Sequence, residues 1–190
     1  YQKNKNAILY IDEQIKQAMN EIEYFEMLKF QVEQANIHEA LEIQEELIEA
    51  KYLFKKDNKP KKKLKPKPLS YVLEDGCIIS VGKNNVQNEY LTHKLAKPNE
   101  MWFHIQKGPG SHVVIHKDTE LTETEIRTAA MLAAYFSSAS SSSSVAVDYT
   151  KIKNIKKIPG KRNCFVTYTH QKTIYIDPDE KFISSLKVKK

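Results

Sequence analysis

The segment from residue 101 to residue 116 concentrates side chains that suit contact with nucleic acid. It holds the single tryptophan, Trp102, three of the six histidines and a Gly-Pro-Gly turn. In a strand, Trp102 and His104 would lie on one face. Rings of this kind stack on exposed bases, and a glycine turn lets backbone N–H groups approach phosphate. The residues predicted to contact or support RNA here are Trp102, His104, Lys107, Gly108, Gly110, Ser111 and His112.

Other interpretations of this segment remain open. Trp102 could pack beneath a helix while His104 binds a backbone carbonyl. His112 and His116 would share one face of a strand, but four residues of strand place them about 13 Å apart, too far for one metal ion. We therefore expect no metal site. The sequence also lacks a serine elbow or a reactive-cysteine signature, so we expect no catalytic residue.

A basic stretch at residues 151–162 is the second candidate for RNA contact. It contains six basic residues and no acidic one. Isoleucines recur every three residues within it, so they can anchor the segment while the lysines share a solvent-exposed side. A stripe of this kind on a folded domain contacts phosphates. The predicted phosphate-binding residues are Lys153, Lys156, Lys157, Lys161 and Arg162.

A cluster of amide side chains follows Gly82 and is the third candidate. Asn84, Asn85, Gln87 and Asn88 could recognise polar groups of RNA. Asparagine also favours turns, because its side chain bonds to nearby backbone groups. The sequence supports both interpretations of these four residues equally.

Charge and glycine divide the 190-residue chain, whose net charge is +6, into three parts. Residues 1–54 contain 5 lysines against 11 acidic residues and lack Gly and Pro, which favours an acidic helical arm. Residues 55–69 are rich in Lys and Pro and predict an extended linker. Residues 70–190 hold all five glycines and predict a globular domain.

The arm has the apolar spacing of a coiled coil. From Ile8 to Phe25 the apolar residues alternate steps of three and four. Asn36 followed by Glu39 predicts a capping box at the start of a second helix. The first helix is too long for the second to cover, so it needs another partner, from a further part of the protein or from a second copy. No apolar run is long enough to span a membrane.

The globular part alternates strand signals with helical ones. Thr122 and Glu125 predict a capping box at the start of one helix, and the serine tract at 137–144 predicts a loop. Together the signals indicate an α+β fold, with a mainly antiparallel sheet and two helices. The expected strands are 71–73, 77–82, 101–106, 111–116, 145–149, 165–169 and 173–176, the expected helices are 89–96 and 122–136, and a polar turn is expected at 84–88.

Several separated motifs, in order, resemble the NFACT-R domain of the NFACT family. They are GKNNVQNEYLT at 82–92, MWFH at 101–104, GPGSHVV at 108–114, VDYT at 147–150 and TIY at 173–175. The resemblance covers about residues 70–180, and the helical arm resembles the coiled-coil middle region of the same proteins. The chain is therefore similar to the C-terminal half of bacterial NFACT proteins, which include RqcH-type ribosome quality-control factors and the streptococcal fibronectin-binding proteins FBPS and FbpA.

The resemblance implies a function in ribosome quality control. It implies binding to obstructed large ribosomal subunits, to rRNA and to tRNA, in support of C-terminal alanine tailing of stalled chains in the cytoplasm. It implies no cofactor and no catalytic residue, because the ribosome performs peptide transfer. The alternative that it suggests is an adhesin module that binds fibronectin or fibrinogen at the cell surface.

Overall fold

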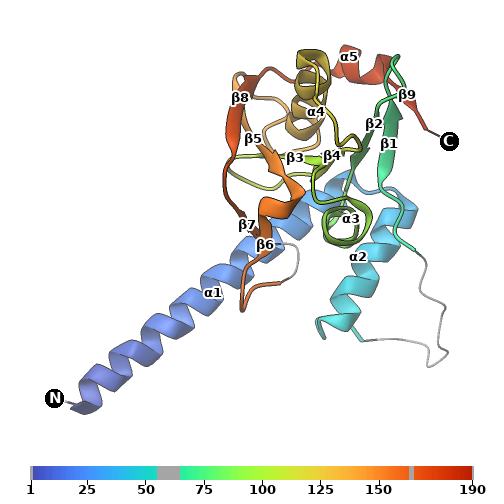
Figure 1. Ribbon diagram of the computed structural model, residues 1–190. Coiled ribbons are helices and arrows are strands. Elements are labelled where there is room, and N and C mark those ends of the chain that lie inside the picture. Colours follow the sequence, from blue (N-terminus) through green and yellow to red (C-terminus); the bar gives the residue numbers. More distant parts are fainter. Residues whose placement is uncertain (1, 55–64, 163–164, 190) are drawn as a thin grey trace.

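The computed structural model describes residues 2–54, 65–162 and 165–189, and shows a long helical arm joined to a globular domain (Figure 1). Most of the predicted Lys/Pro-rich linker lies outside the described residues, as does Cys164. Cys77, the other cysteine, is a free and buried thiol.

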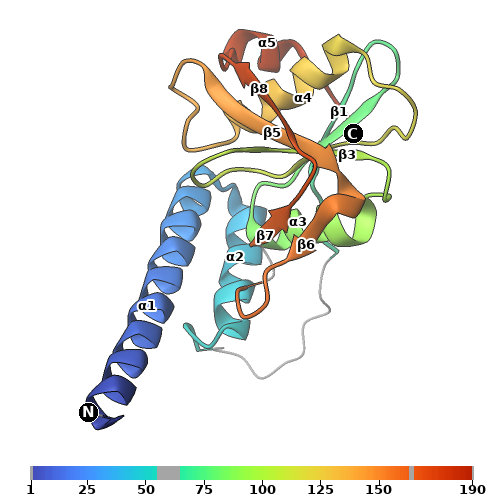
Figure 2. The ribbon, with the colours of Figure 1, turned by 60° about the vertical axis from the view of Figure 1, so that its left-hand side comes forward.

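The arm is a hairpin of two helices, α1 (Gln2–Gln34) and α2 (Ile37–Glu49), which lie side by side (Figure 2). The predicted capping box at the start of α2 is confirmed, because Glu39 N donates to Asn36 Oδ1 and Asn36 N donates to Glu39 Oε2, both at 3.0 Å. Tyr24, Leu28 and Ile43 form the buried core between the helices.

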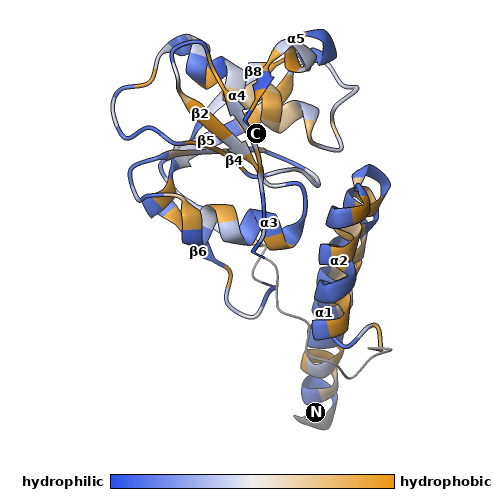
Figure 3. Ribbon diagram, turned by 90° about the vertical axis from the view of Figure 1, so that its right-hand side faces the viewer, coloured by the Kyte–Doolittle hydropathy of each residue, from blue (hydrophilic) through white to orange (hydrophobic). Residues whose placement is uncertain are grey.

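The two arm helices differ in length, with 33 residues in α1 and 13 in α2. The first half of α1 therefore projects away from the domain (Figure 1), and apolar residues continue along the arm (Figure 3). Ile8, Ile11, Ile15 and Ile22 are each more than half exposed. Within the described parts of the chain, this seam has no partner.

The globular domain is built on a seven-stranded sheet of order β8-β5-β3-β4-β2-β1-β9, in which every pair of neighbours is antiparallel. A separate antiparallel hairpin, β6–β7, lies beside it. The prediction of an α+β fold with a mainly antiparallel sheet is confirmed. The strands are β1 (Leu69–Val72), β2 (Ile78–Val81), β3 (Met101–Ile105), β4 (Val113–Ile115), β5 (Val145–Lys151), β6 (Ile155–Lys157), β7 (Val166–Tyr168), β8 (Lys172–Ile176) and β9 (Lys187–Val188).

One face of the sheet is covered by α4 (Glu123–Tyr135) and α5 (Glu180–Ser185). Phe103 and Ile105 from the sheet pack there against Leu132 of α4, and all three are at most 1% exposed. The predicted capping box of Thr122 and Glu125 is confirmed, and it fixes the first turn of α4.

The opposite face carries α3 (Asn85–Tyr90), the π-helical turn η1 (Leu91–Leu95), the 3-10 turn η2 (Ile152–Asn154) and the β6–β7 hairpin, which lie between the sheet and the arm (Figure 2). The predicted polar turn at 84–88 is wrong. Asn84 is instead the N-cap of α3, since its side chain accepts from Gln87 N at 2.8 Å, so the helix begins four residues earlier than expected.

Candidate nucleic-acid interface

Trp102 is completely buried, at 0% exposure. Its ring stacks on His104, with centroids 5.7 Å apart and planes 9° apart, and meets the edge of His112 at 5.2 Å. Tyr168 of β7 closes the cluster at 5.0 Å. Of the two roles predicted for Trp102, contact with RNA is therefore corrected and the supporting role remains, because β7 and η1 cover its ring. Trp102 supports the surface above it from inside.

Of the two histidines beside Trp102, His112 is buried, at 4% exposure, and His104 is partly buried. His104 Nδ1 lies 2.6 Å from the carbonyl oxygen of Ile105, and His112 Nδ1 lies 2.8 Å from Thr92 Oγ1. Burial lowers the pKa of His104, and burial together with the nearby His104 imidazole holds the pKa of His112 well below its usual range. Both rings are thus neutral near pH 7 and offer no charge to a phosphate.

The Gly-Pro-Gly turn is closed against the serine tract of the same chain. Gly110 is buried, pairs with Ser137 in an isolated bridge, and would place a Cβ 3.1 Å from Ser137 Cβ. Gly108 has φ +102°, and a Cβ there would lie 2.8 Å from Ser138 Oγ. Ser111 is 5% exposed. We predicted that RNA would approach the backbone of Gly110 and Ser111. The serine tract of the same chain occupies that position instead.

Two amides of the 84–88 cluster bind the arm. Asn84 Nδ2 and Gln87 Nε2 both donate to Glu42 Oε2 of α2, at 2.7 and 2.8 Å. Lys83 next to them forms an ion pair with Glu39 at 3.1 Å. Asn84 and Gln87 are each at most 2% exposed, so they join α3 to α2 and cannot read RNA.

Asn85 makes the second part of this contact. Its Oδ1 accepts from Gln31 Nε2 at 2.7 Å, its backbone N donates to Gln31 Oε1 at 3.2 Å, and its Nδ2 donates to Glu46 Oε1 at 3.0 Å. Tyr24 donates its hydroxyl to the same Glu46 oxygen at 2.8 Å. One amide thus connects α3 to both arm helices.

Asn88 acts within the domain. Its Oδ1 accepts from His112 N at 3.0 Å, and it is 2% exposed. A Cβ at Gly82 would overlap Asn88 Oδ1, so only glycine allows α3 to pack this closely on the end of β2. The predicted role of the four amides in RNA recognition is therefore corrected to docking and packing.

The second half of the predicted basic stripe is also held by the chain. Lys157 pairs with Glu89 at 2.7 Å, and Lys161 pairs with Glu23 of α1 at 2.9 Å. The Arg162 guanidinium lies over the rings of Tyr24, at 3.9 Å from the centroid, and of Tyr52, at 5.1 Å. Lys161 and Arg162 fasten the loop after β6 to the arm, while Lys157, in β6 itself, is held to α3. A phosphate would have to compete for all three cations.

The first half of the stripe has the predicted arrangement. Ile155 is 8% exposed and packs in the Trp102 cluster, while Lys153 and Lys156 are exposed on either side of it. Lys107, after β3, is exposed as well. No ion pair within the described ranges involves any of these three lysines, so their charges are available to a polyanion.

The sequence reasoning missed the side chains of the arm that receive the domain, above all Gln31, Glu42 and Glu46. No local signal could have identified them, because Gln31 and Asn85 are 54 residues apart in the chain. The helical periodicity of the arm accounts only for its apolar side.

We also did not predict from the sequence that Ser80, His116 and Glu100, which are far apart in the chain, are linked by hydrogen bonds. His116 Nε2 lies 3.0 Å from Ser80 Oγ, and His116 Nδ1 lies 2.9 Å from Glu100 Oε2. Ser80 is only 2% exposed in the middle of β2, and its hydroxyl also bonds to Ser70 Oγ at 2.8 Å. The series is closed to a substrate and joins β1, β2 and β4.

One group of ligand-type side chains converges at the other face, where an oxygen or sulfur atom from each of Asp75, Cys77 and Glu125 lies within 4.8 Å of the others. Lys117 already neutralises Glu125 through an ion pair of 2.8 Å. Burial raises the pKa of Cys77 to about 12, so the thiol stays protonated and is a poor metal ligand.

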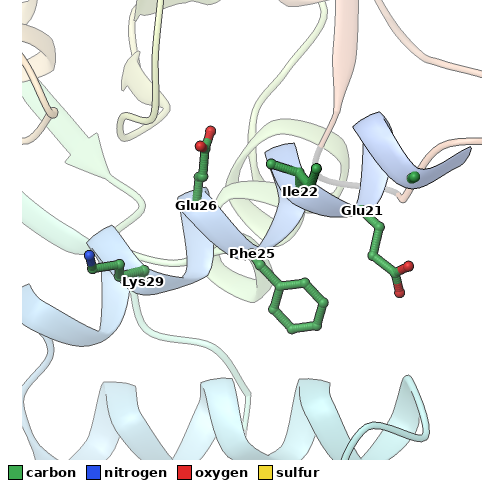
Figure 4. A pocket seen from close by; sticks show the side chains of 6 residues that line it. Glu21, Ile22, Phe25, Glu26 and Lys29 are labelled. Atoms are coloured by element: carbon green, nitrogen blue, oxygen red, sulfur yellow. The ribbon is translucent and has the colours of Figure 1, made fainter. Parts of the chain in front are cut away.

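The arm has a shallow hollow along one side of α1, where Phe25 points toward the side on which α2 lies (Figure 4). All of its lining residues come from this single helix, so no polar groups converge on it from different elements. They are Ala18, Glu21, Ile22, Phe25, Glu26 and Lys29. In the parts of the chain that the structure describes, no helix has the length and apolar character needed to cross a membrane.

Comparisons with known proteins agree with this architecture. Residues 67–167 match the model of the NFACT protein RNA binding domain, and residues 1–66 match that of the NFACT N-terminal and middle domains. The Rqc2 homolog RqcH of Bacillus subtilis is 48% identical over 190 residues, covering 98% of this chain and 33% of that protein. The protein of the same name from Streptococcus pneumoniae strain D39 is 42% identical over 188 residues, covering 98% and 34%.

The chain thus spans about a third of the length of these curated relatives. A solved structure of the C-terminal part of the fibronectin/fibrinogen-binding protein from Streptococcus suis (FBPS) superposes with a TM-score of 0.91 at 43% identity, covering 98% of this chain and 76% of that one. The motifs, the fold and both domain matches lead to one assignment: this chain belongs to the NFACT family and carries its RNA-binding domain.

Proposed function

We propose that this chain is the RNA-binding part of a ribosome quality-control factor that binds obstructed large ribosomal subunits and tRNA. In this role it supports alanine tailing of stalled nascent chains in the cytoplasm. The arm contacts protein, and the basic side of the domain contacts rRNA or tRNA. No residue of this chain performs chemistry, because the ribosome itself transfers the peptide.

The observation that carries this proposal is the similarity to RqcH of Bacillus subtilis, at 48% identity over 190 residues, which covers 98% of this chain. The charge distribution supports it independently. The arm carries 11 acidic residues against 5 lysines, which suits contact with protein. Lys107, Lys153 and Lys156 are exposed on the domain, which suits contact with phosphate.

Cosedimentation of the 190-residue chain with large ribosomal subunits that hold peptidyl-tRNA tests the proposal. We expect binding that weakens steeply between 50 and 200 mM salt, on the order of a factor of three to four for each phosphate that the chain neutralises. Lys156→Glu is expected to weaken binding, while Lys181→Glu on α5 serves as a control of equal charge. Absence of binding at low salt, or binding that does not change with salt, would contradict the proposal.

A second candidate is a module that binds fibronectin or fibrinogen, favoured by the name of the structural relative from Streptococcus suis. The acidic arm with its exposed apolar seam offers a protein-binding surface. This candidate predicts binding to immobilised fibronectin that resists RNase and changes little with salt. Loss of that binding after RNase treatment would assign it to RNA bridging instead.

A further inference from the structure

Three segments of the domain meet at one corner of the sheet and bring exposed lysines together. They are the turn after η1, the end of β5 with η2, and the turn from β7 into β8. In Figure 2 the chain runs from β5 around this corner into β6. We define the corner patch as Lys97, Lys151, Lys153 and Lys172, all of which are exposed.

Backbone bonds fix these segments against one another. Ile152 N donates to the carbonyl of Glu100, and Lys153 N donates to the carbonyl of Pro98, both at 3.0 Å. Thr169 N donates to the carbonyl of Asn154 at 3.3 Å, which attaches the β7–β8 turn to η2. The lysines of the corner patch therefore project from a rigid base and not from a mobile tail.

The strand register gives their spacing. Tyr149 of β5 lies opposite Lys172 of β8, so Lys151, two residues further along β5, is its diagonal neighbour at about 7–8 Å. Lys153 follows on η2, and its backbone bond to Pro98 places it beside Lys97. The backbone positions of the four lysines are thus neighbours around the corner.

The three segments that form the corner contain no exposed acidic residue. Segments 94–101, 149–156 and 166–176 contain six lysines and a single acidic residue, Glu100. Glu100 is 4% exposed, and its carboxylate accepts from Lys97 N and bonds to His116. No ion pair within the described residues involves a lysine of the corner patch. The charges of the corner patch are therefore not neutralised by ion pairs, unlike those of Lys157 and Lys161, which are paired with Glu89 and Glu23.

The corner patch presents charge with little ring surface, since the exposed ring in the turn from β7 into β8 is the imidazole of His170, whose Nδ1 lies 3.0 Å from Thr169 Oγ1. Tyr149 stacks on Phe103 at 5.3 Å, and Tyr168 donates its hydroxyl to Asp148 at 2.9 Å, so both are occupied and only partly exposed. Tyr175 is 63% exposed, but it lies three residues beyond Lys172 on the opposite face of β8. Proteins that bind single strands add aromatic platforms to their basic groove, whereas duplex RNA is bound through phosphates and shape.

We propose that the corner patch is the principal phosphate-binding site of this chain and that its ligand is double-helical RNA, such as a stem of tRNA or rRNA. The inference rests on the proposed function and specifies where, and to which form of RNA, the chain binds. The site contacts the sugar-phosphate backbone and is indifferent to base sequence.

The test compares two triple variants of the 190-residue chain by fluorescence anisotropy with a labelled RNA duplex. One is Lys151→Gln with Lys153→Gln and Lys172→Gln, and the control is Lys181→Gln with Lys187→Gln and Lys189→Gln. The control lysines are exposed on α5 and at β9, the opposite edge of the sheet. Each variant lowers the net charge from +6 to +3, so general electrostatics change equally.

We expect the corner-patch variant to lose affinity by on the order of tenfold and to reduce the salt slope by about 0.9 for each phosphate that it no longer neutralises, while the control stays close to wild type. Equal reductions of affinity in the two variants would overturn the inference and leave the proposed function standing. Tighter binding of wild type to a single strand of the same length would overturn the duplex assignment. Failure of wild type to bind any RNA would overturn both.

Discussion

The two faces of the sheet are covered by layers of opposite chemistry. The α4 and α5 layer is an apolar core in which Ala129, Ala130, Leu132 and Ala133 are fully buried. The α3 layer encloses amides and imidazoles and passes hydrogen bonds on to the arm. The first layer stabilises the domain, while the second defines how the domain is held on the arm. A polar buried layer costs stability unless all its partners are present, and it therefore specifies one docking geometry.

The largest effect is expected in the apolar layer. Leu132→Ala removes a side chain that is 0% exposed and packs on the sheet. We expect a loss of about 2–5 kcal/mol in the free energy of unfolding, since the reduced burial adds to the cost of a cavity. Urea denaturation followed by circular dichroism measures it. Arg127→Ala, an exposed position on α4, is the matched control and should change stability by less than about 0.5 kcal/mol. Similar destabilisation in both would show that α4 does not anchor the core.

The polar layer should respond to Asn85→Ala by loosening the arm. The substitution removes the bonds to Gln31 and Glu46 and leaves polar groups buried without partners, at a cost of about 1–3 kcal/mol. Hydrogen exchange should become faster in α2 and in the second half of α1, while α4 keeps its protection.

Asn99→Ala, at an exposed turn position, is the control for this loosening. Faster exchange in α4 as well as in the arm would mean that the two layers unfold together. In that case the division of the domain into a stabilising layer and a docking layer would be wrong.

The difference between the apolar layer and the polar layer also explains which features could be predicted from the sequence. Thr122 and Glu125 are three residues apart, so the start of α4 is encoded locally, as is the capping box of α2. Most strands of the main sheet follow from apolar runs and a Gly turn for the same reason. The partners of the docking layer are far apart, as Lys161 and Glu23 show, which are 138 positions apart in the sequence. Residue type alone could not decide whether these groups face RNA or the arm.

The proposed RNA site also combines features that local sequence determines with features that only the tertiary fold determines. Exposure of Lys153 and Lys156 follows from the isoleucine spacing, which is a local pattern. Burial of Trp102 depends on Tyr168 and Leu91, which reach it only through the tertiary fold. The corner patch likewise needs the register between β5 and β8, which brings Lys151 beside Lys172.

The two layers are expected to lose their contributions to stability in different pH ranges. Burial lowers the pKa of His104 and His112, so these rings resist protonation in the folded protein while the unfolded chain takes up protons near pH 6.5. Stability from the polar layer is therefore lost as the pH falls below about 6.5. In the apolar layer burial opposes ionisation of Glu125, but the bonds from Lys117 and Thr122 outweigh it and lower its pKa to about 2. The stability that ionised Glu125 contributes is complete above pH 4.5 and is lost only as the pH falls toward 2.

The measurement is the midpoint of urea unfolding between pH 7.5 and pH 5. We expect His112→Asn to flatten this dependence, and His170→Asn, at an exposed position in the turn between β7 and β8, to leave it unchanged. A wild-type midpoint that is constant from pH 7.5 to pH 5 would contradict the assignment of neutral histidines to the polar layer.

The smallest effect is expected for Glu46→Gln, which tests whether the docking layer needs a charge or only an acceptor. Burial raises the pKa of Glu46, so its ionised form is held at a cost above pH 4.5. An amide keeps an oxygen that can accept from Tyr24 and Asn85, and it avoids the cost of a buried charge. Its Nε2 would take the place of Glu46 Oε2, which has no hydrogen-bond partner in the described structure. The uncharged glutamine also loses the attraction of Glu46 to Arg162, which offsets part of the stability gained by removing the buried charge.

We therefore expect Glu46→Gln to change the free energy of unfolding by less than about 1 kcal/mol at pH 7, with the variant gaining on wild type as the pH rises from 4.5 to 7. Glu46→Ala, which removes the acceptor as well, should be clearly destabilised in the same urea titration. If Glu46→Gln loosened the arm as much as Asn85→Ala does, the carboxylate charge itself would be required. The arm would then be held by an ion pair with Arg162, and an RNA phosphate that captured Arg162 would release the domain from the arm.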